Sequence, residues 1–158
     1  MKTAIYPGTF DPVTNGHLDV LKRACRIFDK VIIGVTANPD KEPLFSIEDR
    51  LTLIRENLPR DLNVEAHSFD GLLVDTAKDF DATAIIRGLR AISDFEFEFQ
   101  MTHMNRELDA DIETIFFMPN EVYFFTSSSL IKDVALHKGD ITKFVPPSVA
   151  KALAERFG

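Results

Sequence analysis

Residues 6–17, with the sequence YPGTFDPVTNGH, decide the fold of this chain because they separate two different hydrophobic patterns. Before them, Thr3–Tyr6 is a short apolar run of the kind that forms a buried strand. After them, apolar side chains recur every three or four positions, as on one face of a helix, at Leu18, Leu21, Cys25 and Phe28. The stretch between has two prolines and two glycines, which favour turns. A strand, a turn-rich loop and a helix in this order predict the first unit of an α/β fold.

The alternation of strand-like and helix-like patterns continues along the chain. Further strands are expected at Val31–Thr36, Asn63–His67, Thr83–Ile86 and Thr114–Met118. Helices are expected from Ser46 and over Leu72–Phe80, Ser93–Leu108, Ser127–His137 and Ser148–Arg156. Five strands alternating with helices predict an α/β fold with a doubly wound, Rossmann-like parallel sheet. Because no linker or repeat interrupts the pattern, residues 1–158 are expected to form a single domain.

The segment ISDFEFEFQMTHMNREL, residues 92–108, carries two conflicting patterns. Its FEFEF core alternates with period two, as in a strand, but Ser93 and Asp94 are typical of a helix start, and strong helix formers follow. We interpret the segment as one long helix. This helix is apolar on more than one side, so it lies either deep in the core, for example under the C-terminal helix, or against another subunit.

The composition limits what the protein can bind. The 158 residues include 18 basic and 25 acidic side chains, for a net charge of −7, which argues against nucleic acid as a partner. An anionic ligand would need a local concentration of positive charge. A single cysteine allows no intrachain disulfide, and no apolar run approaches the length of a membrane span. The start of the sequence has no signal-peptide pattern, so a cytoplasmic protein without a membrane partner is expected.

In a doubly wound sheet, ligands bind beyond the carboxyl ends of the strands at which the winding reverses, which points to the loops after the first and fourth strands. In the first loop, Asn15 is an N-cap candidate, and the helix N-terminus that follows suits a phosphate group. Gly16 would let a ligand approach the backbone, His17 would lie in the first turn, and Thr9 adds a hydroxyl. Ordinary capping explains Asn15 and Gly16. It does not explain a histidine at a helix start, or a loop longer than the usual two to six residues or so.

Three further loops supply polar groups to the same edge of the expected sheet. After the fourth strand, Arg87 and Arg90 flank a glycine and resemble an anion clamp, although a single arginine is more often structural. The sequence TSSSLIKDV, residues 126–134, opens a helix with three serines, which is more than a cap requires. Lys41 follows the second strand, where a lone lysine is usually solvated. The sequence has neither G-x-G-x-x-G after the first strand nor a P-loop, which excludes standard NAD and P-loop sites.

The sequence GTFDPVTNGH, residues 8–17, resembles the G-x-F-D-P-x-x-x-G-H signature of the nucleotidylyltransferase superfamily. The blocks IIRGLRAISDFEFEFQMTHMNREL and SSSLIKDV are similar to the corresponding blocks of bacterial phosphopantetheine adenylyltransferases, and the resemblance extends over essentially the whole chain. It implies that AMP is transferred from ATP to 4′-phosphopantetheine, which yields dephospho-coenzyme A and pyrophosphate. It also implies Mg²⁺ as cofactor and a homohexameric assembly.

The resemblance further implies roles for individual residues. The positions that match ATP and nucleotide contacts are Thr9, Phe10, His17, Gly88, Leu89, Arg90, Glu98, Tyr123, Phe124, Phe125, Thr126, Ser127, Ser128 and Ser129. The positions that match contacts with the second substrate are Thr9, Lys41, Leu73 and Arg87. The chain departs from the family at Tyr123, where tryptophan is frequent, at Phe97, where tyrosine is frequent, and at Leu73, where methionine is frequent. These conservative departures bear on packing and leave the expected reaction unchanged.

The residue types also indicate a mechanism. No Ser–His–acid or Cys–His relay is visible, so the acceptor phosphate is expected to attack ATP directly, without a covalent enzyme intermediate. His17, Lys41 and Thr9 would hold the attacking and transferring phosphates, while Arg90 and Ser128 would hold the leaving ones. Without a dedicated carboxylate cluster, magnesium is expected to be carried by ATP. Two alternatives stay open: another nucleotidylyltransferase, which transfers CMP to an alcohol phosphate or AMP to nicotinamide mononucleotide, and a nucleotide-binding module without catalysis.

Overall fold

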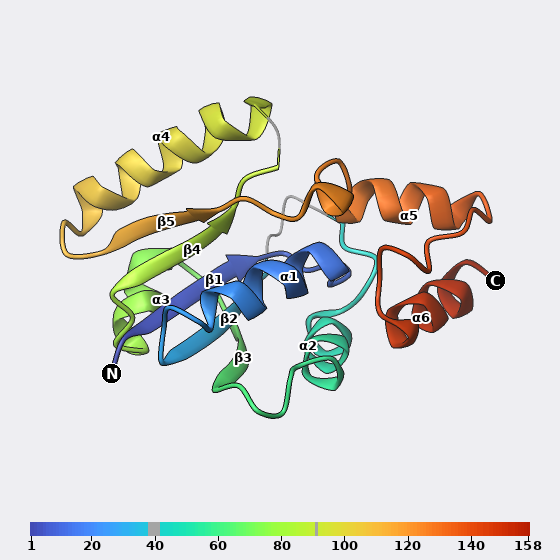
Figure 1. Cartoon of the computed structure of the whole chain (residues 1–158), viewed down its shortest axis with the longest axis horizontal. Coiled ribbons are helices and arrows are strands. Elements are labelled where there is room, and N and C mark those ends of the chain that lie inside the picture. Colours follow the sequence, from blue (N-terminus) through green and yellow to red (C-terminus); the bar gives the residue numbers. More distant parts are fainter. Residues whose placement is uncertain (38–41, 91) are drawn as a thin grey trace.

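The computed structural model of the chain describes residues 1–37, 42–90 and 92–158, in which strands and helices alternate (Figure 1). The strands are β1 (Thr3–Gly8), β2 (Lys30–Thr36), β3 (Val64–Phe69), β4 (Ala84–Gly88) and β5 (Glu113–Phe117). The helices are α1 (Asn15–Ala24), α2 (Ile47–Glu56), α3 (Leu73–Asp79), α4 (Ile92–Leu108), α5 (Ser128–Leu136) and α6 (Pro147–Phe157), with the 3₁₀ helix η1 (Glu121–Tyr123) before α5. None of the helices within the described ranges has both the length and the apolar character that a membrane crossing requires.

The strands pair in the order β3-β2-β1-β4-β5, and every pair is parallel. The register aligns Ile5 of β1 with Ile32 of β2 on one side and with Ile85 of β4 on the other. The winding reverses between β1 and β4, which confirms the predicted doubly wound, Rossmann-like sheet. The carboxyl ends of these two neighbouring strands are therefore the place at which such a sheet binds its ligands.

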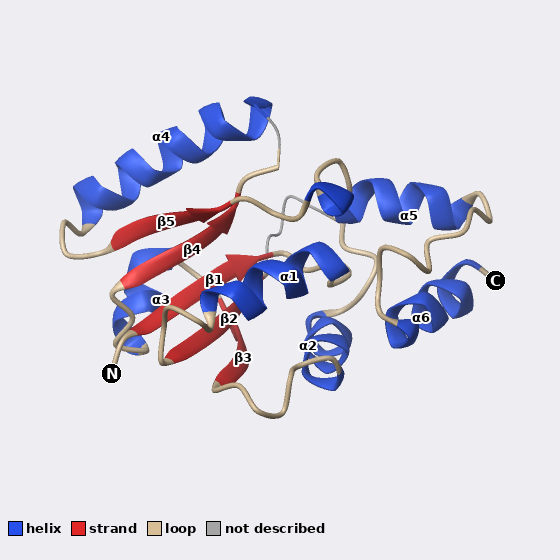
Figure 2. Cartoon of the chain, in the orientation of Figure 1, coloured by secondary structure: helices blue, strands red, loops and turns tan. Residues whose placement is uncertain are grey.

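The central strands are buried on both faces, because successive side chains of a strand point to opposite sides. Ile5, Ile32 and Ile85 pack with residues of α3 in one apolar cluster. Ile33 and Ile86 belong to a second cluster, which also contains residues of α1, α2 and α6. Figure 2 shows helices on both sides of the sheet, as the alternation of the sequence patterns predicted.

The two central strands β1 and β4 both extend beyond the carboxyl ends that their sequence patterns predicted. β1 continues to Gly8 and β4 to Gly88, so that Arg87 and Gly88 are strand residues and not loop residues. The loop between β1 and α1 covers only residues 9–14, which is an ordinary length for such a connection. The sequence pattern overestimated this loop because Pro7 and Gly8, both frequent in turns, pair with β2.

The N-cap of α1 is Thr14, so the prediction of Asn15 as the cap is wrong. Oγ1 of Thr14 accepts the backbone N–H of His17 at 3.2 Å. Asn15 is instead the first helical residue, and its backbone N–H and side-chain amide donate to the carbonyls of Phe144 and Lys143. Both residue types are good caps, and a tertiary contact with the segment before α6 distinguishes them.

Residues 92–108 form the single helix α4, which confirms the helical interpretation of this segment. The burial of α4 is the reverse of that of an ordinary surface helix. Its fully buried side chains, within the described residues, are the polar Glu98 and Asn105. Its exposed side chains include the large apolar residues Phe95, Phe97, Phe99, Met101, Met104 and Leu108. The apolar surface of α4 therefore faces outward, away from the sheet.

The C-terminal helix does not cover α4. Figure 1 shows α4 beside β5, with α6 at the opposite end of the molecule. α6 contacts α2 and α5 instead. Of the two interpretations of the apolar helix, burial under the C-terminal helix is thus wrong.

Candidate active site

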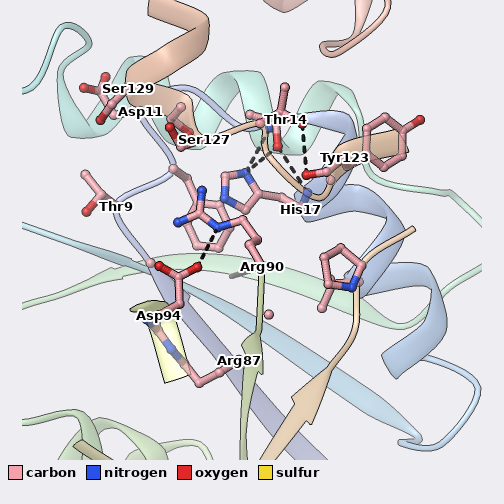
Figure 3. A pocket seen from close by; sticks show the side chains of 18 of the residues that line it. Thr9, Asp11, Thr14, His17, Arg87, Arg90, Asp94, Tyr123, Ser127 and Ser129 are labelled. Carbon is pink, nitrogen blue, oxygen red and sulfur yellow. Dashed lines mark hydrogen bonds and ion pairs between the residues drawn. The ribbon is translucent and has the colours of Figure 1, made fainter. Parts of the chain in front are cut away.

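A cavity of about 340 Å³ opens at the carboxyl ends of β1 and β4 (Figure 3). Its walls come from the ends of these strands, the β1–α1 loop, the first turns of α1 and α4, and the segment from η1 to α5. The predicted site residues that line it are Thr9, Phe10, His17, Arg87, Gly88, Arg90, Glu98, Tyr123, Thr126, Ser127, Ser128 and Ser129. The fold thus brings residues from distant parts of the sequence to one cavity, at the edge that the winding indicates.

Four predicted site residues, Leu73, Leu89, Phe124 and Phe125, do not line this cavity. Leu73, at the start of α3, packs against the apolar cluster beneath that helix. Leu89 donates its backbone N–H to the last residue of β5 at 3.0 Å. Phe124 and Phe125 follow η1 and pack edge to face on each other, and the Phe125 side chain is 81% exposed. Lys41 lies outside the described residues.

His17 is fixed by a reciprocal capping box at the start of α1. The backbone N–H of Thr14 donates to Nδ1 of His17 at 3.0 Å, and Oγ1 of Thr14 accepts the backbone N–H of His17. Because a backbone N–H can only donate, Nδ1 carries a lone pair and the ring proton sits on Nε2. The helix cap therefore selects the tautomer that has Nε2–H as a hydrogen-bond donor.

The environment keeps the His17 ring neutral. Burial, and then the positive charges of Arg90 and Arg87, lower the pKa of His17 from 6.5 to about 3. Figure 3 shows the Arg90 side chain close to the ring. A neutral imidazole with its proton on Nε2 donates a hydrogen bond to an anion without carrying a charge itself. The site therefore uses His17 as a fixed dipole and leaves the positive charge to the arginines.

Phe10 supports His17 from the protein side. Its φ of 48° lies in the left-handed region, which costs a bulky residue of the order of 1–3 kcal/mol. Its ring is 3% exposed and packs edge to face on Tyr6 and His17, at centroid distances of 5.3 and 4.8 Å. The strained backbone thus places an aromatic ring where it holds the imidazole in position.

Asp11 is a cavity residue that the sequence analysis missed. It is 3% exposed, and its carboxylate accepts the backbone N–H groups of Leu44 and Phe45 at 2.8 and 2.9 Å. Nζ of Lys132 also donates to it at 2.8 Å. Asp11 thereby joins the β1–α1 loop, the segment before α2, and α5. Lys132 could have been predicted from the sequence, because it lies one helical turn after the predicted site residue Ser128 and therefore on the same face of α5.

Arg50 of α2 is a second buried residue that the sequence did not reveal. It is 2% exposed, and its Nη1 donates to the carbonyls of Thr9 and Thr36 at 2.9 and 3.1 Å. Its Nε donates to the carbonyl of Phe45 at 3.1 Å. Arg50 therefore holds together the ends of β1 and β2 beneath the cavity. In the sequence it is a polar residue of an amphipathic helix, and nothing distinguishes it from a solvated arginine.

The two arginines predicted as an anion clamp both pair with carboxylates of α4. Arg87 makes three hydrogen bonds of 2.6–3.1 Å to Glu98. Nε of Arg90 lies 3.5 Å from the carboxylate of Asp94, and both of these side chains are partly exposed (Figure 3). The positive groups at the end of β4 are thus balanced by negative groups on the helix that follows.

The opposite wall of the cavity comes from η1 and α5. Ser127 caps α5 by accepting the backbone N–H of Leu130 at 3.1 Å, and Oγ of Ser128 donates to the carbonyl of Pro12 at 2.8 Å. A Cβ on Gly16 would lie 3.3 Å from Cβ of Tyr123, which is tighter than ordinary packing. The contact between α1 and η1 therefore favours glycine at position 16, besides any role that Gly16 has toward a ligand.

The family to which the chain belongs follows from its sequence. The model of the cytidylyltransferase-like family matches residues 5–134, which include β1 without its first two residues, β2 to β5, and α5 without its last two residues. These residues also supply the whole lining of the cavity. The chain therefore belongs to the cytidylyltransferase-like family.

A relative that matches the full length of the chain indicates the subgroup within this family. The phosphopantetheine adenylyltransferase of Opitutus terrae is 57% identical over 158 residues, which are 100% of this chain and 99% of the relative. Within the family, the chain thus groups with the phosphopantetheine adenylyltransferases, which are nucleotidyltransferases. This confirms the resemblance seen in the sequence blocks.

Solved structures with this fold agree with the architecture. A Vibrio parahaemolyticus protein assigned as a nicotinate-nucleotide adenylyltransferase has a TM-score of 0.72 at 20% identity, covering 98% of this chain and 93% of that one. The nicotinic acid mononucleotide adenylyltransferase of Plasmodium falciparum, in complex with NaAD, has a TM-score of 0.71 at 15% identity, covering 98% and 96%. At these identities the likeness shows the fold alone.

Proposed function

We propose that this chain transfers AMP from ATP to 4′-phosphopantetheine and releases dephospho-coenzyme A and pyrophosphate. The observation that carries the proposal is the cavity at the ends of β1 and β4, which gathers the fixed Nε2–H of His17 with Arg87 and Arg90. The full-length likeness to the Opitutus terrae enzyme favours this reaction among nucleotidyl transfers.

The reaction is a direct displacement. An oxygen of the acceptor phosphate attacks the α-phosphorus of ATP, the bond from that phosphorus to the bridging oxygen breaks, and pyrophosphate leaves. The acceptor phosphate is already nucleophilic, so the residues act by positioning and by stabilising charge. His17 donates its Nε2–H to an oxygen of the α-phosphate, where negative charge develops. With Nδ1 occupied by the Thr14 N–H, His17 acts as a donor and not as a general base.

The remaining cavity residues divide between the two substrates. Thr9, at the end of β1, and Arg87, at the end of β4, face the acceptor phosphate. Arg90 and the serines that open α5 hold the β- and γ-phosphates that leave. This division keeps the roles that the sequence resemblance implies, and Figure 3 shows Arg90 between His17 and Asp94 of α4.

Magnesium enters the proposal as a partner of ATP. Within the ranges that the structure describes, no three metal-binding side chains gather at one point. Three of the carboxylates that line the cavity, Asp11, Asp94 and Glu98, are already paired with Lys132, Arg90 and Arg87. This donor set fits an ion held mainly by the phosphate oxygens of ATP. When bound, such an ion would neutralise part of the charge on the leaving pyrophosphate.

The test is pyrophosphate release from ATP with a panel of acceptors. We expect release with 4′-phosphopantetheine and none with pantetheine, which lacks the attacking phosphate. Release with nicotinate mononucleotide or an alcohol phosphate, and not with 4′-phosphopantetheine, would instead support a different nucleotidylyltransferase. Binding of ATP without release in the presence of any acceptor would support a non-catalytic module.

We also propose that the chain works in the cytoplasm as a homohexamer, with the apolar face of α4 packed against other copies. The exposed phenylalanines and methionines of α4 form this face, and the rings of Phe95 and Phe99 stack at 5.9 Å between centroids. Exposed apolar patches of this kind are typical of protein interfaces. The net charge of −7 per chain would keep the outer surface of the assembly soluble.

Sedimentation tests the assembly. We expect a species with about six times the mass of one chain, and smaller species for Phe99→Glu, which places a charge on the apolar face. Glu96→Gln, an exposed change on the same helix, serves as the control and should leave the assembly intact. A stable, fully active wild-type monomer at assay concentration would contradict the proposal.

A further inference from the structure

Tyr6 is a buried cavity residue to which the proposed reaction gives no role. It lies in β1, two residues before the end of the strand, and it is 5% exposed. It is also one of the residues that line the cavity. We propose that the hydroxyl of Tyr6 donates a hydrogen bond to a phosphate oxygen of bound ATP, which makes Tyr6 a further nucleotide-binding residue.

The Tyr6 hydroxyl has no hydrogen-bond partner among the described residues. In the same part of the chain, no fully enclosed side-chain polar atom lacks a partner. The hydroxyl oxygen is therefore not fully enclosed, and the open space that Tyr6 borders is the cavity. A hydroxyl that loses water without gaining a partner costs free energy. A ligand that accepts its hydrogen bond would remove this cost.

The alternation of side chains along the central strands places Tyr6 on the same face of the sheet as α1. Tyr6 and Ile86 belong to the apolar cluster that contains residues of α1, whereas Ile5 and Ile85 belong to the cluster beneath α3. The rings of Tyr6 and His17 lie 6.4 Å apart between centroids. The ligand that Tyr6 meets is thus the one that lies against the start of α1, where His17 donates to ATP in the proposed reaction.

Arg87 projects on the opposite face. It follows Ile86 in β4, and its guanidinium pairs with Glu98 of α4. In the proposed reaction Arg87 faces the acceptor phosphate. The alternation therefore assigns Tyr6 to ATP and not to the acceptor.

The Tyr6 phenol is suited to donate to an anion. Burial raises its pKa above the ordinary value of 10, against the opposing effect of the positive charges of Arg87 and Arg90. The hydroxyl therefore keeps its proton at neutral pH and remains a donor. The ring packs edge to face on Phe10 at 5.3 Å between centroids. Because the donor is held in place before the ligand arrives, little side-chain freedom is lost on binding.

The experiment is calorimetry of ATP binding to Tyr6→Phe, which removes the hydroxyl and keeps the ring. Since a hydrogen bond to a charged group is lost, we expect the Kd for ATP to rise about 10- to 100-fold. The Kd for 4′-phosphopantetheine, measured without ATP, should stay within about twofold, as for independent sites. An unchanged Kd for ATP would overturn the inference, and so would a loss confined to 4′-phosphopantetheine.

Thermal unfolding without ligand separates binding from a structural role. Because the hydroxyl has no partner among the described residues, Tyr6→Phe should not lower the Tm of the free protein by more than about 2 °C. A larger fall would mean that the hydroxyl is bonded within the chain, which contradicts the proposal. Thr76→Val is the matched control. It removes a buried hydroxyl of α3 that donates to the carbonyl of Leu72, outside the cavity, and it should leave the Kd for ATP unchanged.

Binding of AMP and of adenosine tests whether the partner is a phosphate. We expect Tyr6→Phe to weaken the binding of AMP and to leave that of adenosine, which has no phosphate, unchanged. An equal loss for adenosine would place the contact on the sugar or the base and would overturn the inference.

The inference rests on the proposed function, since it needs ATP as a substrate, but the two fail in different ways. Wild-type protein that neither binds ATP nor releases pyrophosphate from it would refute the proposed function. Wild-type binding and turnover of ATP, together with an unchanged Kd in Tyr6→Phe, would refute only the role of Tyr6.

Discussion

Helices α1 and α4 each follow a central strand and each bring residues to the cavity, but they bury opposite kinds of side chain. α1 buries the apolar residues Leu18, Val20, Leu21 and Ala24 against the sheet. α4 buries Glu98 and Asn105 and exposes large apolar side chains, among them Phe97 and Phe99. α1 thus completes its packing within one chain. α4 leaves its apolar face without a partner in the described part of the chain.

The difference bears on how each wall of the cavity is held. On the α1 side, the cap at Thr14 and the ring of Phe10 fix His17 by local contacts. On the α4 side, Asp94 and Glu98 stand on a helix whose outer surface is free. We therefore expect changes on α1 to act within one chain, and changes on α4 to act on assembly or on the positioning of the arginines.

The largest effect, on the free energy of unfolding, should come from variants that test how the two helices pack. Leu21→Ala removes a core side chain that is 1% exposed and should lower the free energy of unfolding by about 2–5 kcal/mol. Phe99→Ala, at a residue that is 62% exposed, should change the unfolding of an isolated chain by less than about 1 kcal/mol. Denaturant unfolding at several protein concentrations distinguishes the two, because only Phe99→Ala should alter the concentration dependence. Equal losses at high dilution would show that α4 is packed within the chain.

His17→Ala should lower turnover by about 100- to 1,000-fold, since one preorganised donor to developing charge contributes about 2.7–4 kcal/mol. Affinity for ATP should fall much less. Pre-steady-state kinetics and calorimetry measure the two quantities separately. His137→Ala is the control, since this histidine is exposed at the end of α5 and outside the cavity. Near-normal turnover in His17→Ala would exclude a role in the transition state.

The burial of His17 should also appear in the pH dependence of stability. The pKa of His17 is about 3 in the folded protein against an ordinary 6.5, so between these values the unfolded chain binds a proton that the folded chain does not. The free energy of unfolding therefore falls as the pH falls through this window, by up to about 1.4 kcal/mol per pH unit. His17→Gln lacks this proton, so its stability should fall less steeply between about pH 6 and pH 4. Parallel slopes for the two proteins would mean that His17 is protonated in the folded state.

The smallest effect should come from Asp94→Asn. The Arg90–Asp94 pair is partly exposed and joined at 3.5 Å, and such pairs contribute about 0–1 kcal/mol. We expect the free energy of unfolding to change by no more than this, whereas Glu98→Gln, which breaks an ion pair whose carboxylate is 8% exposed, should cause a larger loss. A comparison of both variants by denaturant unfolding measures the difference. A loss of several kcal/mol for Asp94→Asn would mean that Arg90 is held as firmly as Arg87.

Much of the fold could be predicted because each element carries its own local pattern. The strands appear as short apolar runs, and their order in the sheet follows from right-handed crossovers. The boundaries were less predictable. Pro7 and Gly8 favour turns as isolated residues, yet both lie in β1, because pairing with β2 outweighs their local preference. Asn15 and Thr14 are equivalent caps in the sequence, and a contact with Phe144 distinguishes them.

The cavity residues also divide into those that a local sequence pattern predicts and those that only tertiary contacts reveal. His17, the two arginines and the serines of α5 follow strand ends and could be found from that position. Leu73 was expected at the site; it lies outside the lining of the cavity and packs, partly buried, against the apolar cluster beneath α3. Asp11 and Arg50 were missed, because a charged residue is normally solvated and only burial reveals that it has a structural partner.

The sequence by itself determined the α/β class, the sheet edge that holds the site and the residue types that face a phosphate. Periodicity and strand ends are local properties, so they are visible before the chain folds. Only the tertiary structure decided which tautomer His17 adopts, which arginine is fixed by Glu98, and which side of α4 faces outward. The tautomer depends on where the helix cap places the Thr14 N–H, and the other two outcomes depend on how α4 packs beside the sheet, so none of them is fixed before the chain has folded.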